Sequence, residues 1–212
     1  MKTVIFDMDG VIFDSERIVK MCWEAVSDKY QLYDIDETYY KSVGTNKAAT
    51  RVILNEKYGA DFDVTSFFED TRTKFYEYTE KYGMPKKDGI EELLDYLKKK
   101  EYRIGLASST RYAAVVEELR DTGLLGYFDY IIGGDMVEHS KPNPEIFEKC
   151  LAGLGGRASD TYVIEDSYNG IRAAKAAGMI PVMVPDMLEP DEEMREKARF
   201  IKKNLYEVMD IL

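Results

Sequence analysis

Residues 4–10 read VIFDMDG, and this stretch is the most informative segment of the chain. Its first three residues are apolar and β-prone, and acidic residues and Gly10 end the run immediately afterwards. We therefore predict a short buried strand from which the chain leaves the sheet at Asp7.

Four later stretches have the same form, a β-prone run that ends in polar residues or glycine. They cover residues 102–107, 130–132, 161–164 and 180–184. Residues 90–97 and 146–154 carry apolar side chains at helical spacing. The alternation predicts an α/β, Rossmann-like fold, a parallel sheet with helices on both faces. Because such sheets bind ligands at the carboxyl ends of their strands, the polar strand ends should converge on one crevice.

One segment interrupts the alternation. Between Ser15 and Gly83 the sequence is helical and charged, has no clear buried strand, and contains half of the chain's 16 tyrosines. It follows the first strand directly, and Gly83-Met84-Pro85 is typical of a return hinge. We predict an inserted, all-helical cap domain at residues 15–83, and an α/β core domain made of residues 1–14 and 84–212.

The charge and the rare residues exclude several classes of protein. The net charge of −11 and the absence of a basic stripe argue against nucleic-acid and membrane partners, although a local pocket can still be cationic. His139 is the only histidine, which excludes multi-histidine zinc sites. The two cysteines are far apart, and no signal peptide or membrane-spanning run is evident. We expect a cytoplasmic protein and, without an exposed heptad pattern, a monomer.

Asp7 and Asp9 carry the strongest chemical signal. A carboxylate at a strand end can attack phosphorus and form an acyl phosphate. A second acid two residues later can protonate the leaving oxygen and then activate water. Short Asp-x-Asp patterns are common, however, and this one alone is also compatible with a Ca²⁺-like loop or a polar strand end.

Two further strand-end signals have ordinary alternatives. The hydroxyl of Ser108 and the amides that follow it, beginning at Ser109, could hold a phosphate oxygen, or both serines could cap a helix beginning near Arg111. Lys141 lies beside two prolines that restrict the backbone and start a helix. It could balance the charge of a nucleophile and a phosphate, or it could be a solvated surface lysine.

Glu165 and Asp166 follow the fourth strand. Adjacent acids here repel one another unless a cation lies between them and Asp7. Mg²⁺ suits such an all-oxygen site, which keeps waters and a substrate phosphate. The alternative is that the two acids form the N-cap of the next helix.

Taken together, the motifs are specific. They are DMDGVIFDS at residues 7–15, LASS at 106–109, SKPNPEIF at 140–147 and VIEDS at 163–167. With them the chain resembles the haloacid dehalogenase superfamily over nearly its whole length, in the branch that contains β-phosphoglucomutase and small-molecule phosphatases.

The resemblance implies a role for each core residue. Asp7 would be the nucleophile and a metal ligand, and Asp9 the general acid and base. Ser108 would bind the phosphoryl group, and Lys141 would neutralise charge. The Mg²⁺ site would comprise Asp7, the backbone carbonyl of Asp9, Asp166, and Glu165 beside them or in an outer layer.

Three functions follow from this resemblance. The first is Mg²⁺-dependent hydrolysis of a small phosphomonoester, a sugar or polyol phosphate, through an aspartyl phosphate. The second is a β-phosphoglucomutase-type mutase that moves phosphate within a sugar. The third, a non-catalytic ligand-binding regulator, is disfavoured because Asp7, Asp9, Lys141 and Asp166 are all intact.

The cap offers two indications. Lys47 and Arg51 lie four residues apart in a helix expected to begin at residues 44–47, so they share a face of that helix. This face either reaches the distal part of a substrate or is simply solvated.

The second indication concerns the first cap helix. The β-phosphoglucomutases carry a histidine a few residues after the pair that matches Asp14-Ser15. Val19 stands there, or Lys20 if the alignment shifts by one, which favours the phosphatase.

Overall fold

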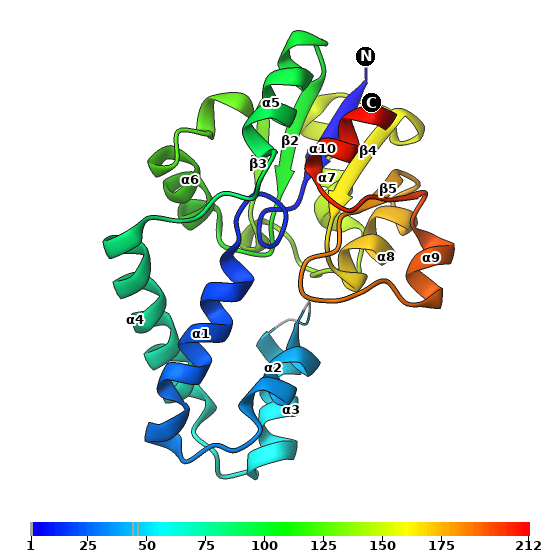
Figure 1. Cartoon of the computed structure of the whole chain (residues 1–212). Coiled ribbons are helices and arrows are strands. Elements are labelled where there is room, and N and C mark those ends of the chain that lie inside the picture. The colour runs from blue at the N-terminus through cyan, green and yellow to red at the C-terminus, as the bar shows by residue number, and fades with distance from the viewer. Residues whose placement is uncertain (1, 44, 46) are drawn as a thin grey trace. The chain divides into compact units, whose positions relative to one another are not determined.

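The computed structural model describes residues 2–43, 45 and 47–212. The chain divides into two compact units, Met1–Phe13 with Lys86–Leu212 and Asp14–Pro85 (Figure 1). We call the first the core unit and the second the cap unit. The two linking segments meet where the Asp14 amide donates a hydrogen bond to the Pro85 carbonyl at 3.0 Å.

The core unit contains a six-stranded sheet in which every neighbouring pair is parallel, in the order β3-β2-β1-β4-β5-β6. The predicted parallel sheet is confirmed. The strands are β1 Thr3–Phe6, β2 Arg103–Ala107, β3 Tyr130–Ile132, β4 Thr161–Glu165, β5 Ile180–Met183 and β6 Phe200–Ile201.

The register of the three central strands fixes where they end. Phe6 at the end of β1 pairs with Leu106 of β2 and with Ile164 of β4. The residues that follow these three therefore lie at the same edge of the sheet. They are Asp7, Ala107 and Glu165.

Helices cover both faces of the sheet (Figure 1). Within the core unit, α5 (Ile90–Lys99) precedes β2, and the cap unit is inserted between β1 and α5. The chain then passes through α6 (Tyr112–Asp121) to β3. It returns to the other side of β1 through α7 (Glu145–Leu154), and α8 (Tyr168–Ala176) joins β4 to β5. Because parallel crossovers are right-handed, the reversal of direction places α5 and α6 on one face and α7 and α8 on the other.

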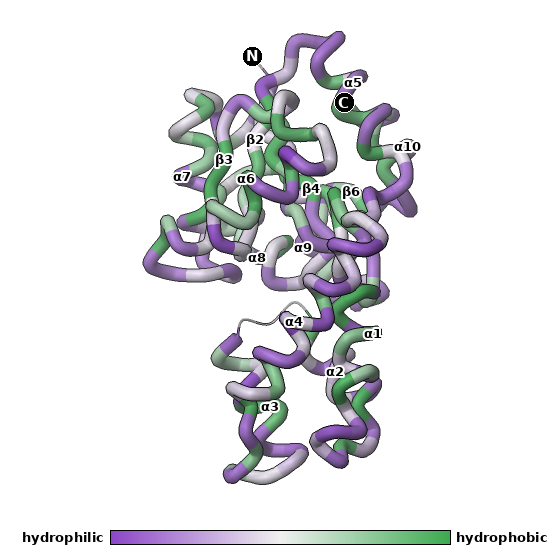
Figure 2. Tube along the Cα trace, turned by 90° about the vertical axis from the view of Figure 1, so that its left-hand side faces the viewer, coloured by the Kyte–Doolittle hydropathy of each residue, from purple (hydrophilic) through white to green (hydrophobic). Residues whose placement is uncertain are grey.

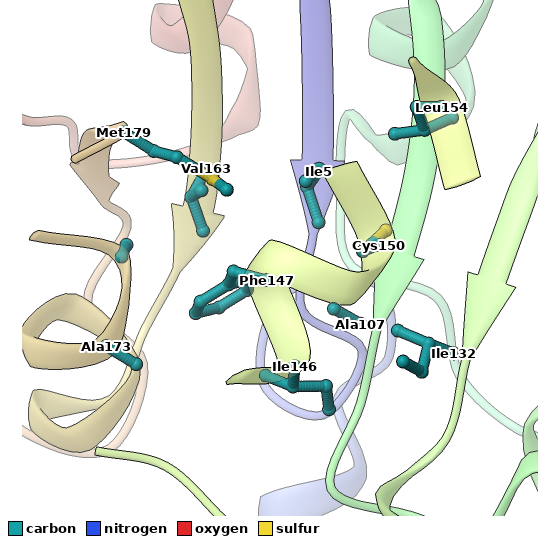
Figure 3. Close-up of a cluster of buried hydrophobic side chains, with 11 residues drawn as sticks. Ile5, Ala107, Ile132, Ile146, Phe147, Cys150, Leu154, Val163, Ala173 and Met179 are labelled. Atoms are coloured by element: carbon teal, nitrogen blue, oxygen red, sulfur yellow. The ribbon is translucent and has the colours of Figure 1, made fainter. Parts of the chain in front are cut away.

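The core between the sheet and the α7–α8 layer is apolar and close-packed (Figure 3). The Phe147 ring of α7 is fully buried between Ile5 of β1 and Val163 of β4, and Ala173 of α8 closes this layer. Burying a side chain of this size contributes roughly 1.5–3 kcal/mol. This layer holds α7, and hence the loop before it that carries Lys141, against the sheet.

The regular structure of the charged segment after Asp186 is helical except for one short strand. It contains α9 (Glu192–Lys197), then β6, then α10 (Leu205–Val208). The strand has only two residues between Arg199 and Lys202, so it has no apolar run that could identify it. Its pairing with Val182 and Met183 of β5 defines it.

The described part of the cap unit contains the α-helices α1 (Ser15–Ser27), α2 (Ile35–Ser42), α3 (Lys47–Tyr58) and α4 (Val64–Tyr82). Its interior is aromatic. Trp23 makes edge-to-face contacts with Tyr39 and Phe67, with ring centroids 5.2 and 5.1 Å apart. Figure 2 shows hydrophobic and hydrophilic residues alternating along these helices, as expected for amphipathic helices around a shared core.

Across the described residues, none of the helices combines the length and the apolar character needed to span a membrane.

Candidate active site

The turn after β1 positions the first two acids. The Asp7 amide donates to the Ile164 carbonyl at 2.9 Å, which continues the sheet by one residue. The chain then folds back, and the Met8 carbonyl accepts the Ile12 amide at 2.8 Å. Gly10 has φ +77°, and a Cβ there would lie 2.3 Å from Asp166 Oδ2. Gly10 therefore permits the turn and leaves room for the Asp166 carboxylate.

Lys141 connects two of the acids. Its Nζ donates to Asp7 Oδ1 at 2.5 Å, to Glu165 Oε1 at 2.8 Å and to the Ala107 carbonyl at 3.2 Å. It also lies 4.8 Å from the centre of the Phe147 ring. Only 8% of the lysine is exposed, so it is not a solvated surface group.

The charges of Asp7 and Lys141 each shift the pKa of the other group. Burial raises the pKa of Asp7 above its usual range, and the Lys141 ammonium opposes that rise. Burial lowers the pKa of Lys141, but the Asp7 and Glu165 carboxylates outweigh it and the net direction is upward. The lysine therefore stays charged at neutral pH.

Three carboxylates form a candidate metal site. Asp7, Glu165 and Asp166 are buried, and each offers an oxygen within 4.8 Å of the others. If all are ionised, Lys141 balances only one of them, so the excess negative charge favours a cation. An all-oxygen donor set suits Mg²⁺. The residues present therefore fit the expected metal.

Glu165 has a second task. Its Oε1 accepts from Lys141, and its Oε2 accepts from the Ser167 amide at 2.7 Å and the Ser167 hydroxyl at 2.9 Å. A Cβ at Gly170 would lie 1.7 Å from Glu165 Oε1, so glycine is required there. Glu165 thus holds the Lys141 ammonium in place beside Asp7.

The two helix-cap alternatives do not match the structure. The N-cap of α8 is Ser167, whose Oγ accepts the Gly170 amide at 3.1 Å, and not Glu165 or Asp166. The N-cap of α6 is Arg111, which makes no side-chain cap hydrogen bond. Neither serine of the 106–109 motif therefore caps this helix.

Ser108 and Ser109 differ in exposure. Ser108 is fully buried at the end of β2, its amide donates to the Ile132 carbonyl at 3.1 Å, and its Oγ accepts the Thr110 amide at 3.0 Å. Ser109 is exposed. A Cβ at Gly134 would lie 2.2 Å from the Ser109 carbonyl oxygen. This glycine therefore allows the segment after β3 to approach the loop after β2.

Two residues near Asp9 escaped the sequence analysis. Thr110 Oγ1 donates to Asp9 Oδ2 at 3.1 Å. Glu118 is half-buried on α6, and burial together with the nearby Asp9 charge raises its pKa to about 7. Thr110 could have been recognised as a candidate because it lies two residues after Ser108, in the same polar stretch at the end of a strand. Nothing in the sequence distinguishes Glu118.

The expected substrate-contacting residues of the cap lie on α3. Lys47 is its first residue and Arg51 follows one turn later, and both are exposed. Arg51 donates to the Thr65 hydroxyl at 3.2 Å. Gly44 and Asn46, where the helix was expected to begin, lie outside the described residues. A role for Lys47 and Arg51 toward substrate stays a prediction.

Comparisons with known proteins agree on the type of protein. The family model "Haloacid dehalogenase-like hydrolase" matches residues 4–184. A phosphorylated carbohydrates phosphatase from Thermotoga maritima is 30% identical over 84% of this chain and 82% of its own length. A fructose-1-phosphate phosphatase from Escherichia coli is 33% identical over 85% and 95%. A solved structure from Thermotoga maritima, assigned as a beta-phosphoglucomutase, is 27% identical with a TM-score of 0.80 and covers both chains completely.

Proposed function

The chain belongs to the haloacid dehalogenase-like hydrolase family, and we propose that it is a Mg²⁺-dependent phosphatase of small sugar or polyol phosphates that acts through an aspartyl phosphate on Asp7. One observation carries the proposal. The buried Lys141 ammonium orients the Asp7 carboxylate beside a cluster of acidic oxygens, at the carboxyl edge of the sheet.

The proposed reaction has two steps. An Asp7 oxygen attacks phosphorus, the bond to the ester oxygen breaks, and Asp9 gives that oxygen a proton. Water then attacks the phosphorus, the bond to Asp7 breaks, and Asp9 takes up a proton from the water. Inorganic phosphate leaves, and both aspartates return to their first state.

Electrostatic stabilisation supplies much of the proposed catalysis, since the transferring phosphoryl group spreads negative charge over its oxygens. Lys141 offsets part of that charge next to Asp7. Ser108 has a hydroxyl proton to donate to the phosphoryl group. Asp7, Glu165, Asp166 and the Asp9 carbonyl would hold Mg²⁺, which when bound neutralises further charge and orients the phosphate.

The relatives support the substrate class. Two of them are named as phosphatases of phosphorylated carbohydrates and of fructose 1-phosphate. We propose that this chain also takes a phosphate on a small polyhydroxylated carbon skeleton, and that the cap unit selects it.

The first prediction concerns this selection. Lys47→Ala should raise KM for the sugar phosphate by about 10-fold, the effect of losing roughly 1.4 kcal/mol of binding, and should leave the small aryl substrate p-nitrophenyl phosphate unaffected. Steady-state kinetics on both substrates measure the difference. Lys57→Ala, near the other end of α3, serves as the control. Equal effects of Lys47→Ala on both substrates would assign Lys47 to a solvated face.

The alternative is a sugar-phosphate mutase, which must restrain Asp9 from activating water. Val19, at the place of the histidine in the mutases, has no hydrogen-bonding group. The Lys20 Nζ donates to Glu24 and, at 2.8 Å, to Asp36 within the cap unit, so its ammonium is already engaged. These observations favour the phosphatase.

The second prediction separates the two functions. With β-glucose 1-phosphate and catalytic glucose 1,6-bisphosphate, the enzyme should release inorganic phosphate faster than it forms glucose 6-phosphate. Coupled assays for the two products, run on the same sample, give the ratio. Glucose 6-phosphate forming faster would assign the enzyme to the mutases.

A further inference from the structure

The loop between β2 and α6 contacts the proposed acid–base residue. Thr110 lies in this loop, and its Oγ1 donates to Asp9 Oδ2 at 3.1 Å across 101 residues of sequence. Its amide donates to Ser108 Oγ at 3.0 Å. One residue therefore links the proposed phosphoryl-binding serine to Asp9.

A second acid, Glu118, lies in the electrostatic surroundings of Asp9. Glu118 is on α6, the helix that follows the loop, and the Asp9 charge contributes to the upward shift of its pKa. When both groups are ionised, the two carboxylates repel one another. The Thr110 hydroxyl is an attractive neighbour of the same carboxylate, to which it donates a hydrogen bond.

We propose that Thr110 is a positioning residue for Asp9, and that its hydroxyl sets which carboxylate oxygen exchanges protons with the substrate. The inference rests on the proposed phosphatase function. Because Oδ2 accepts the threonine proton, the acid form of Asp9 carries its own proton on Oδ1. When the ester bond breaks, that proton passes to the leaving oxygen, and in the second step Oδ1 takes a proton from water.

If Thr110 positions Asp9 for proton transfer, its loss should affect substrates differently according to whether their leaving group needs a proton. A sugar alkoxide needs a proton as it leaves, whereas p-nitrophenolate leaves without one. The parameter kcat/KM reports only steps up to the first irreversible one, the formation of the aspartyl phosphate. A mispositioned Asp9 should therefore lower kcat/KM for a sugar phosphate and spare it for the aryl phosphate.

The experiment compares three variants with the wild type. Thr110→Val removes the hydroxyl and keeps the shape, and Thr110→Ser keeps the hydroxyl. Thr122→Val is the matched control, because it also removes a threonine hydroxyl, one that donates to the backbone carbonyl of Glu118 at 2.7 Å and not to a carboxylate. The probes are p-nitrophenyl phosphate and the fastest substrate among fructose 1-phosphate, glucose 6-phosphate and glycerol 3-phosphate.

In Thr110→Val, the ratio of kcat/KM for the sugar or polyol phosphate to kcat/KM for the aryl phosphate should fall at least ~10-fold, a part of the ~10²–10⁴ that general acid catalysis supplies. Thr110→Ser and Thr122→Val should keep the wild-type ratio. An unchanged ratio in Thr110→Val, with or without a general loss of activity, overturns the proposal. If Thr110→Val does not fold, Thr110→Ala is judged by the same ratio. A wild type that hydrolyses none of the probes contradicts the proposed function itself.

Discussion

Asp7→Asn is expected to lower phosphatase turnover at least ~10³-fold while the protein stays folded. The amide has nearly the shape of the carboxylate, and its oxygen can still accept the Lys141 proton that Asp7 Oδ1 now accepts at 2.5 Å. The amide has no charged oxygen with which to attack phosphorus, so the covalent route is lost. A factor of 10³ corresponds to about 4 kcal/mol of activation free energy.

The measurement combines turnover with trapping of the intermediate. Phosphate release follows turnover, and rapid acid quenching of enzyme mixed with labelled substrate should label the wild type but not Asp7→Asn. Asp121→Asn, an exposed substitution of the same kind at the end of α6, is the control and should behave as wild type. Near-native turnover of Asp7→Asn would remove the central claim.

Removal of divalent metal should abolish activity, and Mg²⁺ should restore it. Asp7, Glu165 and Asp166 bring three oxygens within 4.8 Å of one another, and Lys141 can balance only one of the three charges. Without a cation, burial and the neighbouring Glu165 carboxylate raise the pKa of Asp7, and a protonated Asp7 is no nucleophile. Ca²⁺ should inhibit, because its larger and looser oxygen shell does not enforce the same geometry.

A readout independent of catalysis strengthens this experiment. A ligand that binds only the folded state stabilises it in proportion to the logarithm of its concentration, so Mg²⁺ should raise the Tm of the wild type. Asp166→Asn should lose most of this rise, whereas Asp121→Asn should keep it. Full activity in excess chelator, together with a Tm unaffected by Mg²⁺, would contradict the metal site.

Much of the fold could be read from the sequence because its signals are local. A run such as Val4-Ile5-Phe6 followed by acids identifies both a buried strand and its carboxyl end. Parallel strands end at one edge of a sheet, so residues placed just after such runs had to meet there. This reasoning predicted Asp7, Ser108 and Glu165 as candidate site residues, and the helical pattern and the lack of strands predicted the cap.

Other features needed the tertiary structure, because they depend on contacts between distant segments. Lys141 reaches Asp7 across 134 residues, and only this contact and its burial separate it from a surface lysine. Thr110 meets Asp9 because β1 and β2 pair in one particular register. β6 exists because two residues pair with β5. In each case the local sequence permits several environments, and strand pairing together with helix packing decides which one the side chain occupies.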